Sequence, residues 1–288
     1  MKYSFIGLGK PIGAVNTILR SQIKSYRKAH FGEPLPLEAG GVFASNLSAA
    51  ALFAGENDMC VYQTVEELLL NSDIIFVFLS DKALKSISLS FGKLDLKNKI
   101  FCHVSPAFSA DILDFNSRNS YVSLFFPYFK KDEEGRTIPG RIIAEGYGKR
   151  LYSFKEALNA LSIDFSFVTA QEKLMYITGA TIAKDFPLML EYTAKRLIKY
   201  SLSSDTELAD ELMEMAKINP MNLNSYNPAN EDNSNFALKQ LEALENLGIN
   251  DITRLYSSLL EISAHTKEEQ SKETERIAML AKRFPQQN

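Results

Sequence analysis

The segment FIGLGKPIGAV, residues 5–15, constrains the fold more than any other part of this sequence. The residues before it, Lys2–Ile6, are typical of a short β-strand, and those after it have apolar side chains at helical spacing. A strand, a glycine turn and a helix in this order bind pyrophosphate in dinucleotide-binding folds, because the helix N-terminus attracts the anion. Gly7 and Gly9 occupy the first two glycine positions of that fingerprint. Ile12 occupies the third, and the next glycine follows one residue later.

We expect this turn to bind the pyrophosphate of a dinucleotide, and the alternative is a tight turn without a ligand. The proline inside it is compatible with a helix start, since the first helical turn needs no N–H partner at that position. The predicted cofactor contacts of the turn are Gly7, Leu8, Gly9, Lys10, Pro11 and Ile12.

Strand-like runs recur through the first half of the chain. The longest, Ile74–Leu79, is apolar on both sides, which is typical of a strand covered by helices on both faces of a parallel sheet. The predicted fold class is α/β, with an N-terminal Rossmann-type doubly wound sheet followed by an all-α C-terminal domain. We expect residues 1–168 to form the dinucleotide-binding domain and residues 169–288 a helical substrate and dimerisation domain.

Long periodic segments replace the strand-like runs after about residue 166. Pro187 lies inside the first of them, where we expect it to kink or end the helix. An asparagine-rich stretch, residues 219–235, predicts a loop with helix-capping residues. The predicted helices span residues 171–201, 206–217 and 235–247, with two more between 249 and 284.

Charge and cysteine content exclude several function classes. The net charge is −3, with no local basic patch, so we expect no nucleic-acid partner. Cys60 and Cys102 lie in hydrophobic runs without metal-ligand spacing, which favours buried thiols in the reducing cytoplasm over a disulfide or a metal site. No run approaches the roughly 20 apolar residues of a membrane span, and the N-terminus lacks a signal-peptide pattern.

Several stretches, in order along the chain, resemble one known family. They are FIGLGKPIGAV, DIIFVFLSDKAL, HVSPAFSADIL, FFPYF, RIIAEG, YITGATIAKDF and NPANEDNSNFALKQLEAL. Together they resemble Rossmann-like oxidoreductases with a helical C-terminal domain of unknown function, in the wider group of 6-phosphogluconate dehydrogenase-like, pyrroline-carboxylate reductase-like and ketopantoate reductase-like proteins. The chain departs from the family pattern where Pro106 replaces a glycine, and where Phe126 and Ile177 replace histidines. The most specific activity that the resemblance implies is that of the alternative type of ketopantoate reductase.

The end of the second strand decides between NAD and NADP, because an acidic residue there binds the free ribose hydroxyl of NAD. This chain has Ser45 and Asn46 at that place and no carboxylate, so we predict NADP as the cofactor. Both residues could instead cap the next helix. Ser80 and Asp81, at the end of the long apolar strand, are predicted to lie near the nicotinamide ribose, and Asp81 could also be a helix cap.

Candidate catalytic groups follow the predicted sheet. Reduction of a carbonyl group needs a proton donor or a cation at the oxygen. Lys184 is our candidate, because GATIAKDF resembles the lysine helix of hydroxyacid dehydrogenases and ketopantoate reductases; the alternative is a surface lysine. Asn230 is predicted to bind substrate, or else to cap a helix, and Ser105 to contact nicotinamide or substrate. His103 would contact a ligand or hydrogen-bond to backbone.

The predicted function is an NADPH-dependent reductase of a small 2-oxo acid, most specifically ketopantoate, acting as a homodimer through its helical half. A catalytically inactive NADP-binding sensor and an imine reductase of the pyrroline-carboxylate type are the alternatives, since the fold alone does not separate these functions.

Overall fold

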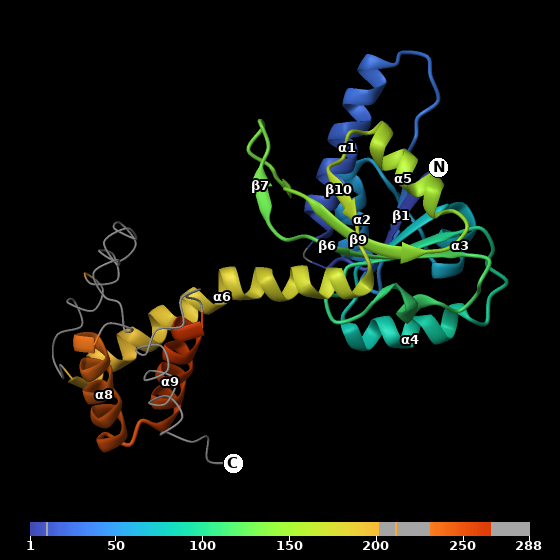
Figure 1. The fold of residues 1–288 in the computed structure, drawn as a ribbon. Helices are drawn as coiled ribbons and strands as arrows, with labels where there is room; N and C mark the ends of the chain where they lie inside the picture. Colours follow the sequence, from blue (N-terminus) through green and yellow to red (C-terminus); the bar gives the residue numbers. More distant parts are fainter. Residues whose placement is uncertain (10, 202–210, 212–230, 266–288) are drawn as a thin grey trace. The chain divides into compact units, whose positions relative to one another are not determined.

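The computed structural model describes residues 1–9, 11–201, 211 and 231–265, in two compact units, Met1–Lys184 and Asp185–Asn288. The first unit is a mixed sheet covered by helices, and the described part of the second is helical (Figure 1). The predicted fold class is therefore confirmed.

An eight-stranded sheet in the order β10-β9-β6-β5-β4-β1-β2-β3 forms the first unit. From β3 to β6 the strands are parallel and follow the order of a doubly wound dinucleotide-binding sheet, which reverses between β1 and β4. β9 pairs antiparallel with β6, and β10 runs parallel to β9. The strands are β1 (Lys2–Ile6), β2 (Glu38–Phe43), β3 (Cys60–Val61), β4 (Ile74–Val77), β5 (Ile100–His103), β6 (Ser120–Phe125), β9 (Ile142–Tyr147) and β10 (Phe165–Phe167).

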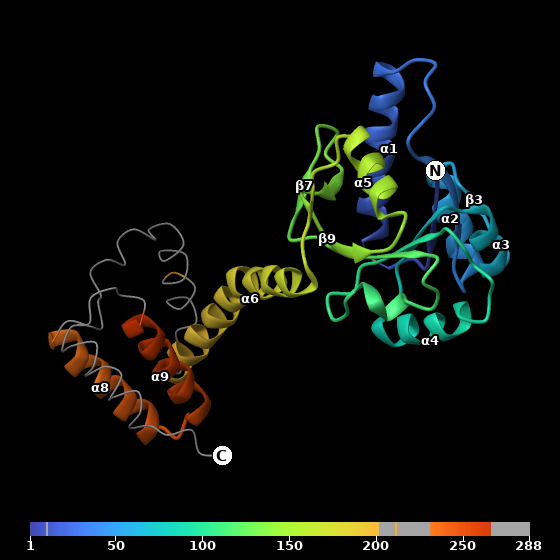
Figure 2. The same ribbon diagram turned by 45° about the vertical axis from the view of Figure 1, so that its right-hand side comes forward.

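Helices cover both faces of this sheet (Figures 1 and 2). The core layer that includes Phe5 and Phe76 packs under α1 (Ile12–Ala29), α2 (Leu47–Asn57) and α5 (Leu151–Ala160). The layer on the opposite face, which includes Val77 and Phe101, packs under α3 (Val65–Asn71), α4 (Asp81–Phe91) and the short helix η1 (Ala110–Leu113). Burial on both faces explains why the β4 segment is apolar throughout.

The last strands of the sheet were not predicted from the sequence. β9 contains a glutamate and a glycine, and β10 has three residues, so neither shows a strong strand pattern. A separate hairpin, β7 (Phe129–Lys131) and β8 (Thr137–Pro139), was also not predicted.

The second unit contains the end of α6 (Ala170–Ser201), α8 (Glu231–Asn246) and α9 (Asn250–His265). Pro187 lies inside α6 and does not end that helix. The units divide within α6, whereas the sequence analysis placed the domain boundary just before it. Most of the helix predicted over 206–217, and the last predicted helix, lie outside the described residues. Among the described helices, none is long and apolar enough to cross a membrane.

Candidate functional site

The glycine turn lies between the ends of β2 and β4. The N–H of Gly7 donates to the carbonyl of Phe43 at 2.8 Å. Gly7 has a φ of +83°, and a Cβ at this position would lie 2.3 Å from the carbonyl oxygen of Phe78. Only glycine fits here, because both the backbone conformation and the neighbouring strand exclude a side chain. Gly9 is also close to Phe78, with 3.2 Å from a built Cβ to the same oxygen.

Helix α1 begins directly after this turn with no side chain capping its N-terminus and no acidic residue in its first turn. Its N-terminal dipole suits an anion, and the N–H of Ile12 donates to the carbonyl of Gly9 at 3.0 Å. Ile12, at the third fingerprint position, is buried in the core, so the helix is held by an apolar contact there. The following Gly13 has open space around it. Leu8 is half-buried, and Lys10 lies outside the described residues.

The ends of β2 and β4 each lead into a capped helix. The Asn46 side chain accepts from the N–H of Ala49 at 3.0 Å and caps α2. The Ser80 hydroxyl accepts from the N–H of Ala83 and caps α4, so the predicted capping role at this turn falls to Ser80 rather than Asp81. The neighbouring Ser45 is exposed.

Ser105 follows β5 and hydrogen-bonds to Asp81, which follows β4. Its hydroxyl donates to Oδ1 of Asp81 at 2.7 Å and accepts from the N–H of Ala107 at 3.1 Å. Ser105 is buried and Asp81 is exposed. The structure therefore brings Gly7, Gly9, Asp81 and Ser105 to the carboxyl edge of the parallel strands, where such sheets bind ligands.

His103 is buried at the end of β5, and among the described residues its hydrogen bonds are with backbone groups. Its Nδ1 accepts from the N–H of Ser105 at 3.2 Å, so the proton is on Nε2, which donates to the carbonyl of Ser109 at 3.0 Å. Burial, with a contribution from Lys173, lowers the pKa of His103 to about 4. The histidine is therefore neutral at pH 7 and has the structural contacts that the sequence analysis gave as the alternative.

A buried ion pair beside this edge was missed by the sequence analysis. Nζ of Lys173 lies 3.0 Å from Oε1 of Glu145, and the two side chains are 4% and 7% exposed. The one available signal was a glutamate inside the apolar run RIIAEG. Its lysine partner is 28 residues away in sequence and looks like any lysine in the first turn of a helix.

Two predicted catalytic residues are not placed at this edge. Lys184 is the last residue of the first unit, and its side chain is outside the described part of the chain. Its position on α6 is eleven residues, or about 16 Å along the helix axis, beyond Lys173. Asn230 lies outside the described residues, as do residues 219–229 of the predicted loop. Residues 231–235, predicted as the end of that loop, are instead the first residues of α8. The described residues contain no cluster of histidine, cysteine or acidic side chains that could bind a metal ion.

No known protein-family model matches the chain, and no curated protein matches its sequence. Solved structures match its fold. A protein from Thermotoga maritima is 16% identical with a TM-score of 0.57, and the match covers 91% of this chain and 97% of that one. A Bacteroides fragilis protein provisionally described as an NADP oxidoreductase is 14% identical with a TM-score of 0.57, covering 90% and 95%.

A semialdehyde dehydrogenase NAD-binding protein from Cupriavidus necator, solved with calcium and NAD, is 13% identical with a TM-score of 0.51, covering 83% of this chain and 89% of that one. At such identities the likeness shows the fold alone. The chain shares with these proteins a Rossmann-type sheet followed by helices.

Proposed function

We propose that this protein is an NADPH-dependent reductase of a small 2-oxo acid, most specifically of 2-dehydropantoate to pantoate. The observation that carries the proposal is the N-terminus of α1, which has no side-chain cap and follows the glycine turn at the point where the strand order reverses. A Cβ at position 7 would fill the turn. The Bacteroides fragilis and Cupriavidus necator proteins, described with NADP and NAD respectively, support a nicotinamide dinucleotide as the cofactor.

The chemistry needs a hydride at the carbonyl carbon and a proton at the carbonyl oxygen. A reduced nicotinamide dinucleotide supplies the hydride when bound. The carbonyl oxygen keeps the electron pair of the broken π bond, and Lys184 is the group that donates its proton in this proposal. Asn230 holds the carboxylate or hydroxyl of the substrate. Ser105, fixed by Asp81, contacts the nicotinamide amide or the substrate.

Substrate reduction is the direct test. Purified protein is mixed with NADPH and a panel that contains ketopantoate, other 2-oxo acids and a cyclic imine, and NADPH absorbance is followed. Turnover of ketopantoate is expected, with most of it lost in Lys184→Ala while NADPH binding is retained. Turnover of the imine alone would replace the proposal by imine reduction. NADPH binding without turnover of any compound would replace it by a sensor.

The choice of NADPH rests on the end of β2, where Ser45 is exposed and residues 44–48 include no carboxylate. Ser45→Asp is expected to weaken NADPH binding by about tenfold through repulsion of the 2′-phosphate, and to leave NADH binding equal or stronger. Dissociation constants of both cofactors, from nicotinamide fluorescence, measure this. Ala51→Asp adds the same charge at an exposed position one turn into α2 and is the control. Equal effects of the two variants would show that general charge, not the ribose site, sets the preference.

A homodimer through the helical part and a cytoplasmic location complete the proposal. Exposed apolar side chains on α6 support the first, among them Met175 and Tyr176 in one unit and Met189 and Tyr192 in the other. The two free cysteines support the second: Cys102 is buried, as predicted, whereas Cys60 is exposed, so the prediction of a buried thiol there was wrong.

A further inference from the structure

A row of polar side chains crosses three strands next to the candidate cofactor site. His103 on β5 is in register with Ser123 on β6, which is in register with Glu145 on β9. All three side chains are buried on the sheet face that α4 and η1 cover. A sheet face normally buries apolar residues, so this row needs an explanation beyond packing.

Lys173, in the first turn of α6, hydrogen-bonds to two members of this row, Ser123 and Glu145. Its Nζ donates to Oε1 of Glu145 and to the carbonyl of Phe108, each at 3.0 Å, and also to the hydroxyl of Ser123. The Ser123 hydroxyl in turn donates to the carbonyl of Phe108 at 3.2 Å. All three donors of the lysine are therefore used inside the protein.

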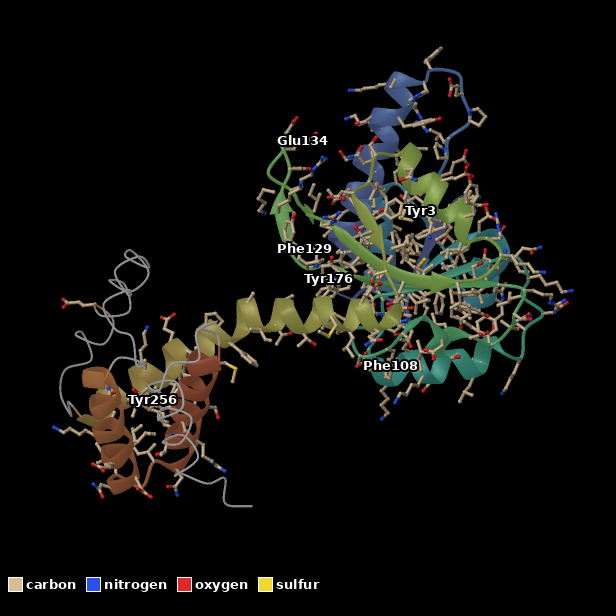
Figure 3. All side chains as sticks on the ribbon, viewed as in Figure 1. Tyr3, Phe108, Phe129, Glu134, Tyr176 and Tyr256 are labelled. Atoms are coloured by element: carbon tan, nitrogen blue, oxygen red, sulfur yellow. The ribbon has the colours of Figure 1, made fainter. Side chains whose placement is uncertain are left out.

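The side chains of the row hydrogen-bond to the backbone of one short segment, residues 104–110, which we call the edge turn. It follows β5 and contains Ser105. Glu145 accepts from the N–H of Ala110 at 2.8 Å, and His103 contacts two further peptide groups of the turn. Phe108 lies beside α4 (Figure 3), where Nζ of Lys85 is 4.9 Å from its ring centre. The peptide groups held by the row are the N–H of Ser105, the carbonyls of Phe108 and Ser109, and the N–H of Ala110.

Stability alone does not explain this arrangement. Removing two charges from water is costly, and apolar residues of similar volume often stabilise a fold as well as a buried ion pair does. An ion pair with fixed hydrogen bonds instead defines one position for the backbone that it contacts. Here that backbone leads directly to Ser105, whose hydroxyl is bound to Asp81 at the sheet edge.

We propose that Lys173 and Glu145 are positioning residues that fix the edge turn, so that Ser105 meets the nicotinamide half of the cofactor. This inference rests on the proposed function. In a doubly wound sheet the dinucleotide crosses the switch point, with its adenosine half toward β2 and its nicotinamide half toward β4 and β5. The pair therefore acts on the nicotinamide half and leaves the adenosine half unaffected.

The test compares two ligands, NADPH and 2′,5′-ADP, which keeps the adenosine half and lacks the nicotinamide. Lys173→Met and Glu145→Gln are each expected to bind 2′,5′-ADP within about twofold of the unaltered protein and NADPH about tenfold more weakly. Each single variant leaves one buried charge unpaired and should also unfold at a lower temperature. Titration calorimetry gives both affinities, and circular dichroism gives the unfolding midpoint.

The double variant Lys173→Met/Glu145→Gln separates positioning from folding. It removes both charges, so its unfolding midpoint should recover toward that of the unaltered protein while NADPH affinity stays low, because Phe108 still lacks its lysine donor. Lys99→Met is the matched control. Lys99 donates to the carbonyls of Leu70 and Ser72 at the opposite end of β5, so its removal should change stability and not the ratio of the two affinities.

The outcomes distinguish this inference from the function on which it rests. If the unaltered protein binds neither ligand, the proposed function falls and the inference falls with it. If it binds both and the folded double variant keeps the ratio of the two affinities, the inference alone is wrong. A ratio that changes equally in Lys99→Met would also overturn it.

Discussion

Gly7→Ala is expected to lower the free energy of unfolding by about 3 kcal/mol and to weaken NADPH binding by about 100-fold. A Cβ at position 7 would lie 2.3 Å from the carbonyl oxygen of Phe78, and the φ of +83° is unfavourable for alanine. The turn must therefore move away from β4. This displaces the N-terminus of α1 from the place where it would meet the pyrophosphate.

Gly55→Ala, in a neighbouring helix, is the matched control. Gly55 lies in α2, and a Cβ there has open space around it. Alanine should raise the free energy of unfolding by about 0.5 kcal/mol, because it is the better helix former, and leave NADPH binding unchanged. Urea unfolding and nicotinamide fluorescence titration measure both variants. Similar losses in the two would show that the close contact at position 7 does not hold the turn.

The parts of the fold that the sequence predicted are those that local patterns determine. The apolar run of β4 indicated a strand buried on both faces, and the glycine turn indicated a strand followed by a helix at residues 2–29. Helix capping was visible at Asn46, whereas at the next turn the predicted cap, Asp81, is one residue after the actual cap, Ser80. Each of these signals comes from residues within about one helical turn of each other.

The buried polar row could not be predicted in this way, because its members come from separate strands and a helix. Glu145 belongs to a strand that pairs antiparallel with β6, and its partner Lys173 lies in the first turn of α6. Lys173 and Lys184 are eleven residues apart, about three helical turns, so they lie on nearly the same side of α6. Periodicity alone therefore does not tell which of the two lysines meets the sheet, and the resemblance of its motif favoured Lys184.

Acidification is expected to destabilise this protein through His103. Burial, with a smaller contribution from Lys173, lowers the pKa of this histidine from 6.5 to about 4 in the folded state. Between these values the unfolded chain binds more protons than the folded one, so stability falls as the pH falls. The loss begins near pH 6.5, is complete near pH 4, and amounts to about 3 kcal/mol. The physical cause is the cost of charging an imidazole that is fully buried.

His103→Gln isolates this effect, because glutamine can still donate to the carbonyl of Ser109 and does not titrate. Urea unfolding from about pH 7.5 to about pH 4.5 should give a flatter profile for the variant than for the unaltered protein, and the carboxylates common to both cancel in the difference. His30→Gln removes an exposed histidine and should leave the profile unchanged. Parallel profiles for the unaltered protein and His103→Gln would mean that His103 takes up its proton without unfolding, and that the edge turn opens to admit it.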